Sequence, residues 1–373
     1  IIVNTSKIIL ITHEYPPYRG GAGIVCEEIA NSALDGGLNL EVWAPEYSKN
    51  PQVGTVNLLP HKGGQGFIVS FKLIRETIRR LKTESKGLKI HIAEPGSLRA
   101  FIRFGWLISS KYQFLATIHG SELLRFTSNP FEKWMFKKFL KKCIKIHVLS
   151  KYNRNQLTKI FPEIKSRILC LPGAPARRVI TCLSKEAERV GSEQISILCV
   201  GRIHPRKGQD CLLNALIKLP QSTQEKIKIT FAGPATKKNF LEKLIRLKDD
   251  FMGEVIFKGD ISSEELSSLY KMSDIFALTP MPKSKSVEGF GLVFLEASAH
   301  GLPIVAHCTG GVEDSVLDEK TGLLANPNDL ESLTNKLGDL IHDKELRNRL
   351  GENGKEWALP HSWSELVKNL YVD

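Results

Sequence analysis

The chain has 373 residues, 42% of them hydrophobic, which is enough for two domains with cores of their own and excludes an intrinsically disordered protein. No apolar run approaches the roughly 20 residues needed to span a bilayer, and the seven cysteines include no Cys-x-x-Cys pair, so neither a disulfide framework nor a zinc site is predicted. The net charge of +12 is uneven, because residues 1–178 carry 28 Lys and Arg against 12 Asp and Glu, or +16. This basic half predicts an anionic partner.

Short β-rich runs alternate with helical periods through the first half of the chain. This alternation is typical of βαβ units around a parallel sheet. The expected strands are residues 7–12, 40–44, 89–93, 114–118 and 144–149, and the expected helices are residues 22–34, 69–83 and 131–142.

Two prolines and a glycine interrupt the pattern at residues 171–178, which we interpret as a domain linker. A second alternation follows, and residues 330–370 are largely helical. Because ligands bind at the carboxyl ends of strands in such sheets, we expect two doubly wound domains with a cleft between them. The expected strands here are residues 195–200, 227–232, 255–257, 275–278 and 303–306, with helices near 211–219 and 264–271.

Two acidic residues, Glu288 and Glu296, bracket the run EGFGLVFLE, whose pattern indicates a glycine-rich turn that opens a helix. The start of a helix presents free N–H groups and the positive end of the helix dipole, and glycine lets a phosphate approach the backbone. A carboxylate on either side of such a turn can accept hydrogen bonds from hydroxyl groups. A phosphate flanked by two hydroxyl-bearing rings describes a sugar nucleotide.

Two further segments predict phosphate contacts. Residues 20–23 (GGAG) follow a strand and open a helix, which suits a phosphate or a reacting sugar, although a tight turn without a ligand would leave the same pattern. Arg202 and Lys207 follow the strand at 195–200. The planar guanidinium of an arginine and the mobile ammonium of a lysine together suit a pyrophosphate. The alternative is a basic loop that is only solvated. No Asp-x-Asp occurs near a strand end, so no metal site is predicted.

His119 follows the strand at 114–118 and precedes Gly120. A lone histidine is more often structural, but the carboxyl end of a parallel strand is where ligands bind. We therefore expect His119 to lie in the site. Glu122 also suits the ordinary role of an acid at a helix N-terminus.

The helix at 131–142 combines an apolar stripe with a basic face. The apolar residues recur every four positions and predict a core-facing side: Phe131, Met135, Phe139 and Cys143. The segments 74–82 and 99–103 are basic too, so this half should attract anionic lipid or an acidic acceptor. Nucleic acid would explain the same charge, but no recognition motif for it occurs.

Four segments in this order resemble the family 4 glycosyltransferases, a group of retaining enzymes with the GT-B fold: YPPYRGGAG at 15–23, TIHGSE at 117–122, GRIHPRKG at 201–208 and EGFGLVFLE at 288–296. The resemblance covers nearly the whole chain. It implies an α/β protein with two Rossmann-like doubly wound domains facing a central cleft. Residues 1–178 would bind the acceptor, residues 179–355 would bind the nucleotide sugar, and residues 356–373 would form a helix that packs back on the first domain.

The resemblance also implies residue roles. His119 and Glu288 would act at the reacting centre, where His119 positions the donor sugar and Glu288 accepts hydrogen bonds from the hydroxyls of that sugar. Glu296 would hold the ribose, and backbone N–H groups at 290–292 would face sugar and phosphate. The donor-binding set is Gly21, Gly23, Arg202, Lys207, Phe290, Gly291, Leu292 and Glu296.

The expected function is transfer of a hexose, with retention, from a nucleoside-diphosphate sugar to a glycan, lipid-linked or other acceptor in cell-envelope or polysaccharide biosynthesis. No metal or other cofactor is expected, because Arg202 and Lys207 would stabilise the leaving diphosphate. The enzyme would be cytoplasmic, either free or held at an anionic membrane surface on the inner face of the cell membrane. The alternatives are a sugar-nucleotide epimerase of the same fold and a non-catalytic basic membrane-binding scaffold.

Overall fold

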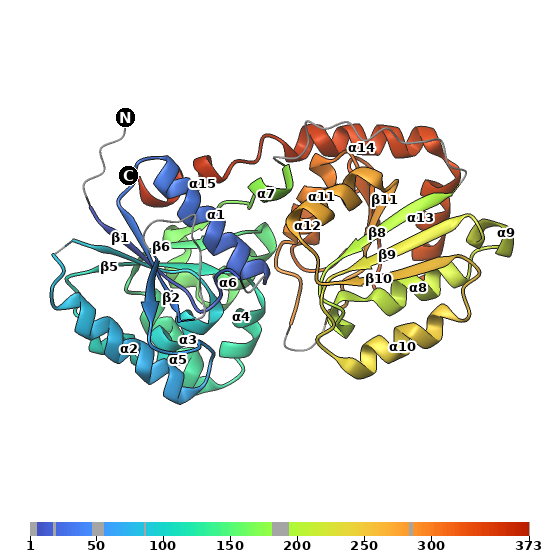
Figure 1. Ribbon diagram of the computed structural model, residues 1–373. Helices are drawn as coiled ribbons and strands as arrows, with labels where there is room; N and C mark the ends of the chain where they lie inside the picture. Colours follow the sequence, from blue (N-terminus) through green and yellow to red (C-terminus); the bar gives the residue numbers. More distant parts are fainter. Residues whose placement is uncertain are drawn as a thin grey trace. The chain divides into compact units, whose positions relative to one another are not determined.

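The computed structural model describes residues 6–17, 20–46, 56–85, 87–180, 194–282 and 286–372. The chain forms two compact units (Figure 1). Unit 1 comprises Ile1–Gly173 and Ser362–Asp373, and unit 2 comprises Ala174–His361. The chain therefore leaves unit 1 inside the predicted linker, five residues before the predicted boundary at 178.

Unit 1 contains a seven-stranded parallel sheet with the order β3-β2-β1-β4-β5-β6-β7. Two strands lie on one side of β1 and four on the other. The order of the strands therefore reverses next to β1, which is the doubly wound pattern. The strands are β1 (Ile8–Ile11), β2 (Leu40–Pro45), β3 (Val56–Leu59), β4 (Lys89–Ile92), β5 (Gln113–Ile118), β6 (Cys143–Val148) and β7 (Ile168–Cys170).

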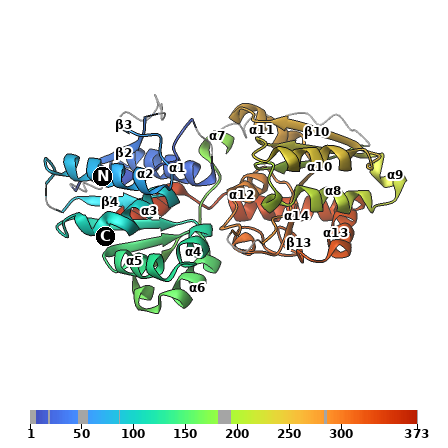
Figure 2. The same ribbon diagram turned by 90° about the horizontal axis from the view of Figure 1, so that it is seen from below.

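Helices cover both faces of this sheet (Figure 1). One face carries α1 (Gly21–Asp35) and α15 (Trp363–Tyr371), and the other carries α2 (Phe67–Leu81), α3 (Pro95–Phe104) and α5 (Pro130–Leu140). Figure 2 shows α3 between α2 and α5. Beneath these three helices lies an apolar core in which strand side chains such as Ile9 and Ile90 meet helix side chains such as Leu98 and Phe101.

Local signals explain where several helices begin. The Glu94 carboxylate caps α3 by accepting from the N–H groups of Gly96 and Ser97, and Asn129 caps α5 ahead of a proline at its first position. Ser150 caps α6 (Lys151–Ile160) in the same way. The short helix α4 (Ser121–Phe126) follows β5 directly.

Unit 2 repeats this architecture with a six-stranded parallel sheet of order β10-β9-β8-β11-β12-β13. Its strands are β8 (Ile195–Val200), β9 (Ile227–Ala232), β10 (Glu254–Gly259), β11 (Ile275–Leu278), β12 (Ile304–His307) and β13 (Gly322–Ala325). Its helices include α7 (Arg177–Ile180), α8 (Gln209–Ile217), α9 (Gln221–Gln224), α10 (Lys238–Lys248), α11 (Ser263–Met272), α12 (Leu292–Ala299), α13 (Leu330–His342) and α14 (Lys344–Ala358). The predicted α/β class with two parallel-sheet domains is confirmed.

The C-terminal segment returns to unit 1, but it begins later than predicted. Trp357 lies in α14 of unit 2, and only α15 packs on the unit 1 sheet. Lys89 Nζ on β4 donates to the Tyr371 carbonyl at 2.7 Å, and the Tyr371 hydroxyl lies 2.5 Å from His91 Nδ1. The predicted start at 356 is therefore wrong by six residues. In the part of the chain that the structure describes, every helix is too short or too polar to cross a membrane.

Candidate functional site

A cluster of opposite charges lies at the carboxyl end of the unit 2 sheet, around Glu288. Arg206 Nη1 and Lys207 Nζ both donate to Glu288 Oε2, at 2.7 and 2.8 Å. The two cations sit in the loop between β8 and α8, and their side chains are 15% and 13% exposed. The fold thus brings Glu288 and Lys207, which the sequence predicts as site residues, into direct contact.

Burial and charge act against each other in this cluster. Burial would raise the pKa of Glu288, but the Lys207 and Arg206 charges outweigh it and lower that pKa to about 2. Burial lowers the pKa of Lys207, Glu288 opposes this, and the Arg206 and Arg202 charges add to the lowering. Two cations therefore contact the Glu288 carboxylate, and the Arg202 charge acts on Lys207 beside them. These four groups carry two positive charges in excess, which suits a dianionic ligand.

Arg202 and Arg206 differ in what their side chains do. The Arg202 side chain is exposed to solvent beside the cluster, whereas Arg206 is held against Glu288. Sequence reasoning selected Arg202 and missed Arg206. The signal that could have found Arg206 is its position next to Lys207 in GRIHPRKG. Two adjacent basic residues can together neutralise a buried acid.

Gly208 determines the path of this loop. It has φ +69°, it precedes α8, and its carbonyl accepts a hydrogen bond from Thr279 Oγ1 at 2.7 Å. A Cβ at this position would overlap the Thr279 carbonyl. Only glycine therefore permits the close approach that presents Lys207 to Glu288.

Gly208→Ala should lower the free energy of unfolding by about 2–4 kcal/mol, because left-handed strain adds to the overlap. Thermal unfolding measures this loss. Gly338→Ala in α13 is the control, because a Cβ there would make only ordinary contact, at 3.7 Å from Leu219, and Ala favours a helix over Gly. Equal stability of the Gly208→Ala variant and the wild type would contradict this account of the loop.

The backbone of Glu288 is held by a second glycine turn. The Gly311 N–H donates to the Glu288 carbonyl at 2.8 Å, and a Cβ on Gly310 would overlap that carbonyl. The glycine pair that ends AHCTGG at 306–311 therefore fixes the backbone position of Glu288.

The segment after Glu288 forms the expected turn and helix. Gly291 has φ +86° and immediately precedes α12. A Cβ added at Gly291 would lie 2.5 Å from the Phe294 ring. The side chains of Phe290 and Leu292 are buried, and Ser315 Oγ donates to the Phe290 carbonyl at 2.8 Å. Because the first N–H groups of a helix have no partner within it, this turn offers backbone donors. It can therefore receive an anion or a sugar oxygen.

Glu296 lies inside α12 among apolar neighbours and is buried. The Tyr270 hydroxyl donates to Glu296 Oε2 at 3.0 Å, and the His300 ring stacks on Tyr270 with centroids 5.0 Å apart. Burial raises the pKa of Glu296, while Tyr270, Arg178 and the Ala176 N–H oppose the rise. Neither Tyr270 nor His300 was predicted as part of the site, and no local pattern singles them out.

The remaining predicted residues belong to unit 1. Gly21 and Gly23 occupy the first turn of α1, the first helix after β1. His119 follows β5; its Nε2 lies 2.8 Å from the Ala93 carbonyl, and its N–H donates to the Glu122 carboxylate. Among the described residues, the second Glu122 oxygen is buried without a partner. Both groups lie at the carboxyl edge of the unit 1 sheet, where a ligand is expected.

His13, which sequence reasoning also missed, follows β1 at the same edge. Its N–H donates to Glu94 Oε1 at 2.8 Å, and its Nδ1 lies 2.9 Å from the Gly64 carbonyl. Burial lowers the pKa of His13 to about 4 despite the Gly64 contact. The side chain is therefore neutral at pH 7.

Comparison with known proteins bears on both units. The Glycosyltransferase Family 4 model matches residues 19–172, and the Glycosyl transferases group 1 model matches residues 183–357. The chain is 27% identical, over 94% of both chains, to the GDP-mannose-dependent alpha-(1-6)-phosphatidylinositol monomannoside mannosyltransferase of Mycolicibacterium smegmatis.

Solved structures show the same fold. Sucrose-phosphate synthase from Thermosynechococcus elongatus superposes with a TM-score of 0.76 at 19% identity, over 98% of this chain and 97% of that one. HepE of Anabaena in complex with UDP and glucose superposes with a TM-score of 0.76 at 16% identity and the same coverage.

Proposed function

The chain belongs to the family 4 glycosyltransferases and has the GT-B fold, and from this premise we propose that it is a retaining, metal-independent mannosyltransferase that uses GDP-mannose and a lipid-linked or glycan acceptor. Hexosyl transfer from a nucleoside-diphosphate sugar follows from the family. Mannose and GDP are proposed because a relative matched along nearly the whole chain is GDP-mannose-dependent and acts on a phosphatidylinositol mannoside. The proposed place of action is the cytoplasm, at the inner face of the cell membrane.

The observation that carries the proposal is the cationic cluster at Glu288. Arg206 and Lys207 hold Glu288 ionised, and Arg202 lies exposed beside them, so the loop has an excess of positive charge next to the N-terminus of α12. We assign the diphosphate to Arg202, Lys207 and the α12 N–H groups. Arg206 then positions Glu288, whose other oxygen can accept from a sugar hydroxyl.

In the proposed reaction the bond between C1 of the sugar and the β-phosphate oxygen breaks, and its electron pair stays on the phosphate. The acceptor oxygen bonds to C1 on the same face, and its proton passes to that phosphate oxygen, so configuration is retained. Arg202 and Lys207 stabilise the charge that develops on the leaving group, as a metal does elsewhere. His119 positions the donor sugar, Gly21 and Gly23 present backbone N–H groups, and Glu296 holds the ribose.

Arg202→Ala should weaken GDP binding about 10- to 150-fold and leave guanosine binding unchanged, because one charge-assisted contact contributes roughly 1.5–3 kcal/mol. Calorimetry with GDP and guanosine tests this. Arg206→Ala is the comparison variant; it should reduce turnover through Glu288 and affect GDP affinity less. If Arg202→Ala binds GDP normally, the diphosphate assignment of Arg202 is wrong.

Turnover with a panel of donors tests the function itself. The protein is incubated with GDP-mannose, UDP-glucose or ADP-glucose, with and without phosphatidylinositol mannosides, and with or without EDTA. We expect GDP release that depends on acceptor and survives EDTA, and a product with the α configuration of the donor by NMR. Conversion of the donor to its epimer without an acceptor would favour the epimerase, and no turnover with any donor would favour a binding scaffold.

A further inference from the structure

Unit 1 exposes an unusual set of large apolar side chains on the helices of one face. Phe67 and Ile68 at the start of α2 are 66% and 70% exposed, Trp106 in the short helix η1 (Gly105–Leu107) is 65% exposed, and Phe131 on α5 is 67% exposed. Phe71 and Trp134 are also exposed. Soluble proteins rarely gather such residues on one surface unless it binds something.

Ring contacts and hydrogen bonds link several of these side chains to neighbouring residues on three helices. The rings of Phe67 and Phe71 both lie edge-on to Phe104 at the end of α3, with centroids 5.1 and 5.8 Å apart. Trp106 Nε1 donates to the Arg103 carbonyl at 3.1 Å. Phe131 stacks on Trp134 in α5, whose neighbour Glu132 binds Arg99 of α3. These side chains lie on neighbouring helices of one face of unit 1, and Phe67, Ile68, Phe71, Trp106, Phe131 and Trp134 are together called the aromatic face here.

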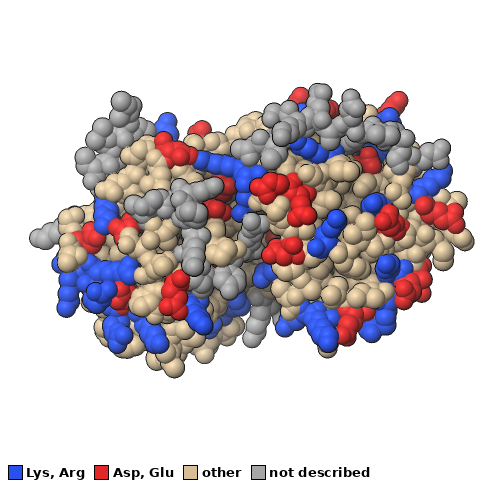
Figure 3. All heavy atoms as spheres, in the orientation of Figure 1, with Lys and Arg blue, Asp and Glu red and all other residues tan. Residues whose placement is uncertain are grey.

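Basic side chains accompany the aromatic face. Lys138 Nζ lies 3.7 Å from the centroid of the Trp134 ring, and Lys72, Arg75 and Arg79 are exposed on the outer side of α2. In Figure 3, Lys and Arg gather over the part of unit 1 where Figure 1 draws α2 and α5. Aromatic side chains with Lys and Arg on amphipathic helices suit the interface of an anionic bilayer, where rings enter the headgroup layer and cations meet phosphates.

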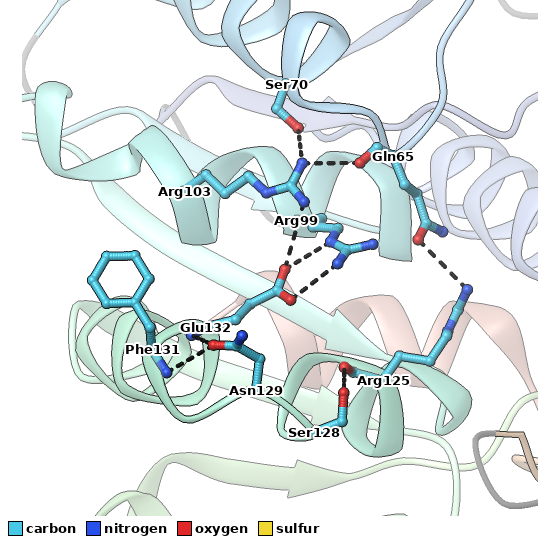
Figure 4. Close-up of polar contacts among 9 residues, drawn as sticks. All are labelled: Gln65, Ser70, Arg99, Arg103, Arg125, Ser128, Asn129, Phe131 and Glu132. Carbon is cyan, nitrogen blue, oxygen red and sulfur yellow. Dashed lines mark hydrogen bonds and ion pairs between the residues drawn. The ribbon is translucent and has the colours of Figure 1, made fainter.

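A partly buried arginine cluster lies next to this face (Figure 4). Arg99 makes a bidentate contact with Glu132 at 2.7 and 3.0 Å, and Arg103 lies 3.8 Å from the same carboxylate. Arg125 reaches toward the Gln65 side chain, and its Nε is buried with no partner among the described residues. Arg99 and Arg103 thus share the Glu132 carboxylate, and Arg125 has no acidic partner among the described residues, so the three guanidinium groups carry two positive charges in excess of Glu132. Burial and the Arg99 charge lower the pKa of Arg103, while Glu132 opposes this.

We propose that the aromatic face docks unit 1 on an anionic lipid bilayer, with Ile68, Phe71, Trp106, Phe131 and Trp134 in the headgroup layer and a lipid phosphate at the arginine cluster. The biological role of docking rests on the proposed function, since docking would bring the enzyme to a lipid-linked acceptor. Phe136 on the same helix takes no part, because it is fully buried against Phe126 and Phe161. Lys137 is paired with Glu163 at 2.8 Å.

Two sets of variants test the docking, measured by co-sedimentation with vesicles of phosphatidylcholine alone or with phosphatidylglycerol. The charge set replaces Lys72, Arg75, Lys138 and Lys141 with Gln. Its matched control makes the same change of charge in unit 2, at Lys237, Lys238, Arg246 and Lys248, which are all exposed. The apolar set is Ile68→Ser, Phe131→Ser and Trp134→Ser, whose side chains are exposed enough that unfolding is not expected.

We expect the wild type and the control to bind phosphatidylglycerol vesicles and to bind phosphatidylcholine weakly. The charge set should bind several hundredfold less tightly, because each basic residue near an anionic surface strengthens binding roughly fivefold. The apolar set should lose the binding that survives high salt, since salt screens only the charges. The proposal would be overturned if the unit 2 control lost vesicle binding as much as the charge set, or if the wild type bound no vesicles. It would also be overturned if the wild type self-associated through the apolar residues, so that the apolar set abolished self-association, and bound no lipid.

GDP release from GDP-mannose is measured on every variant with phosphatidylinositol mannoside dispersed in detergent as acceptor, so that turnover does not require a bilayer. Normal release with lost vesicle binding supports docking by this face. If the wild type shows no release yet binds vesicles through these residues, the proposed function fails and the docking surface stands.

Discussion

Replacing Glu288 with Gln should lower kcat about thirty- to a thousandfold and leave GDP affinity unchanged or higher. The loss of turnover follows from losing a transition-state hydrogen bond to a charged group, about 2–4 kcal/mol. The affinity should not fall, because Arg206 and Lys207, which donate to Glu288 Oε2, keep their charge and lose its counter-ion. Steady-state kinetics and calorimetry with GDP separate the two effects.

Glu352→Gln is the matched control, since Glu352 is exposed on α14. A Glu288→Gln variant that turns over normally, or that loses GDP affinity in proportion to kcat, would refute the sugar-facing role. The pH profile adds an independent check. Because the pKa of Glu288 is lowered to about 2, its ionisation should place no limb in the kcat profile between pH 4 and 6 in the wild type.

Unit 1 should lose stability steeply as the pH falls from about 6.5 toward 4, because it holds neutral histidines in its core. His91 Nε2 lies 2.7 Å from Thr117 Oγ1, which lies 3.1 Å from His147 Nδ1, and His147 Nε2 lies 2.9 Å from the Leu171 carbonyl. Burial and the His147 charge lower the pKa of His91 to about 3. Burial lowers the pKa of His147 to about 4, against the Leu171 contact.

The direction follows from proton uptake. An unfolded histidine binds a proton below about pH 6.5, and these folded ones do so only near pH 3 to 4, so the unfolded state gains protons first and stability falls with pH. Each histidine contributes about 1.4 kcal/mol per pH unit in that range, or roughly 4 kcal/mol for the pair between pH 7 and 5. His13, with its pKa lowered to about 4 by burial, adds in the same direction.

Urea unfolding at pH 7, 6 and 5 measures the slope. His147→Gln should reduce the number of protons taken up on unfolding by about one, and so make the slope shallower. His342→Gln, at an exposed position in unit 2, should leave the slope unchanged. A stability of unit 1 that is flat between pH 7 and 5 would mean that these histidines are protonated in the folded state.

Most strands could be predicted because parallel strands are buried on both faces and leave unbroken apolar runs. The expected strands at 195–200, 227–232 and 275–278 match β8, β9 and β11 residue for residue. Elements without such a run were missed. The half-exposed β3, the polar helix α6 and α10 are examples.

The helix α5 shows where a periodic pattern misleads. A step of four residues advances about 40° around a helix, so the predicted stripe from Phe131 to Cys143 turns away from the core. Phe131 is exposed, Phe136 and Phe139 are buried, and Cys143 already belongs to β6. The helix itself was predicted correctly, and its orientation needed the packing of α3 and the sheet.

By itself, the sequence determined the family, the two parallel-sheet units and the segments that form the candidate site, because these depend on local patterns and on four motifs in order. Only the tertiary structure decided which side chains meet. Arg206 contacts Glu288 across 82 residues, and Tyr371 contacts His91 across 280. Neither pair can be recognised from periodicity or composition in the sequence. Their contacts form only when distant elements pack together and bury both groups away from water.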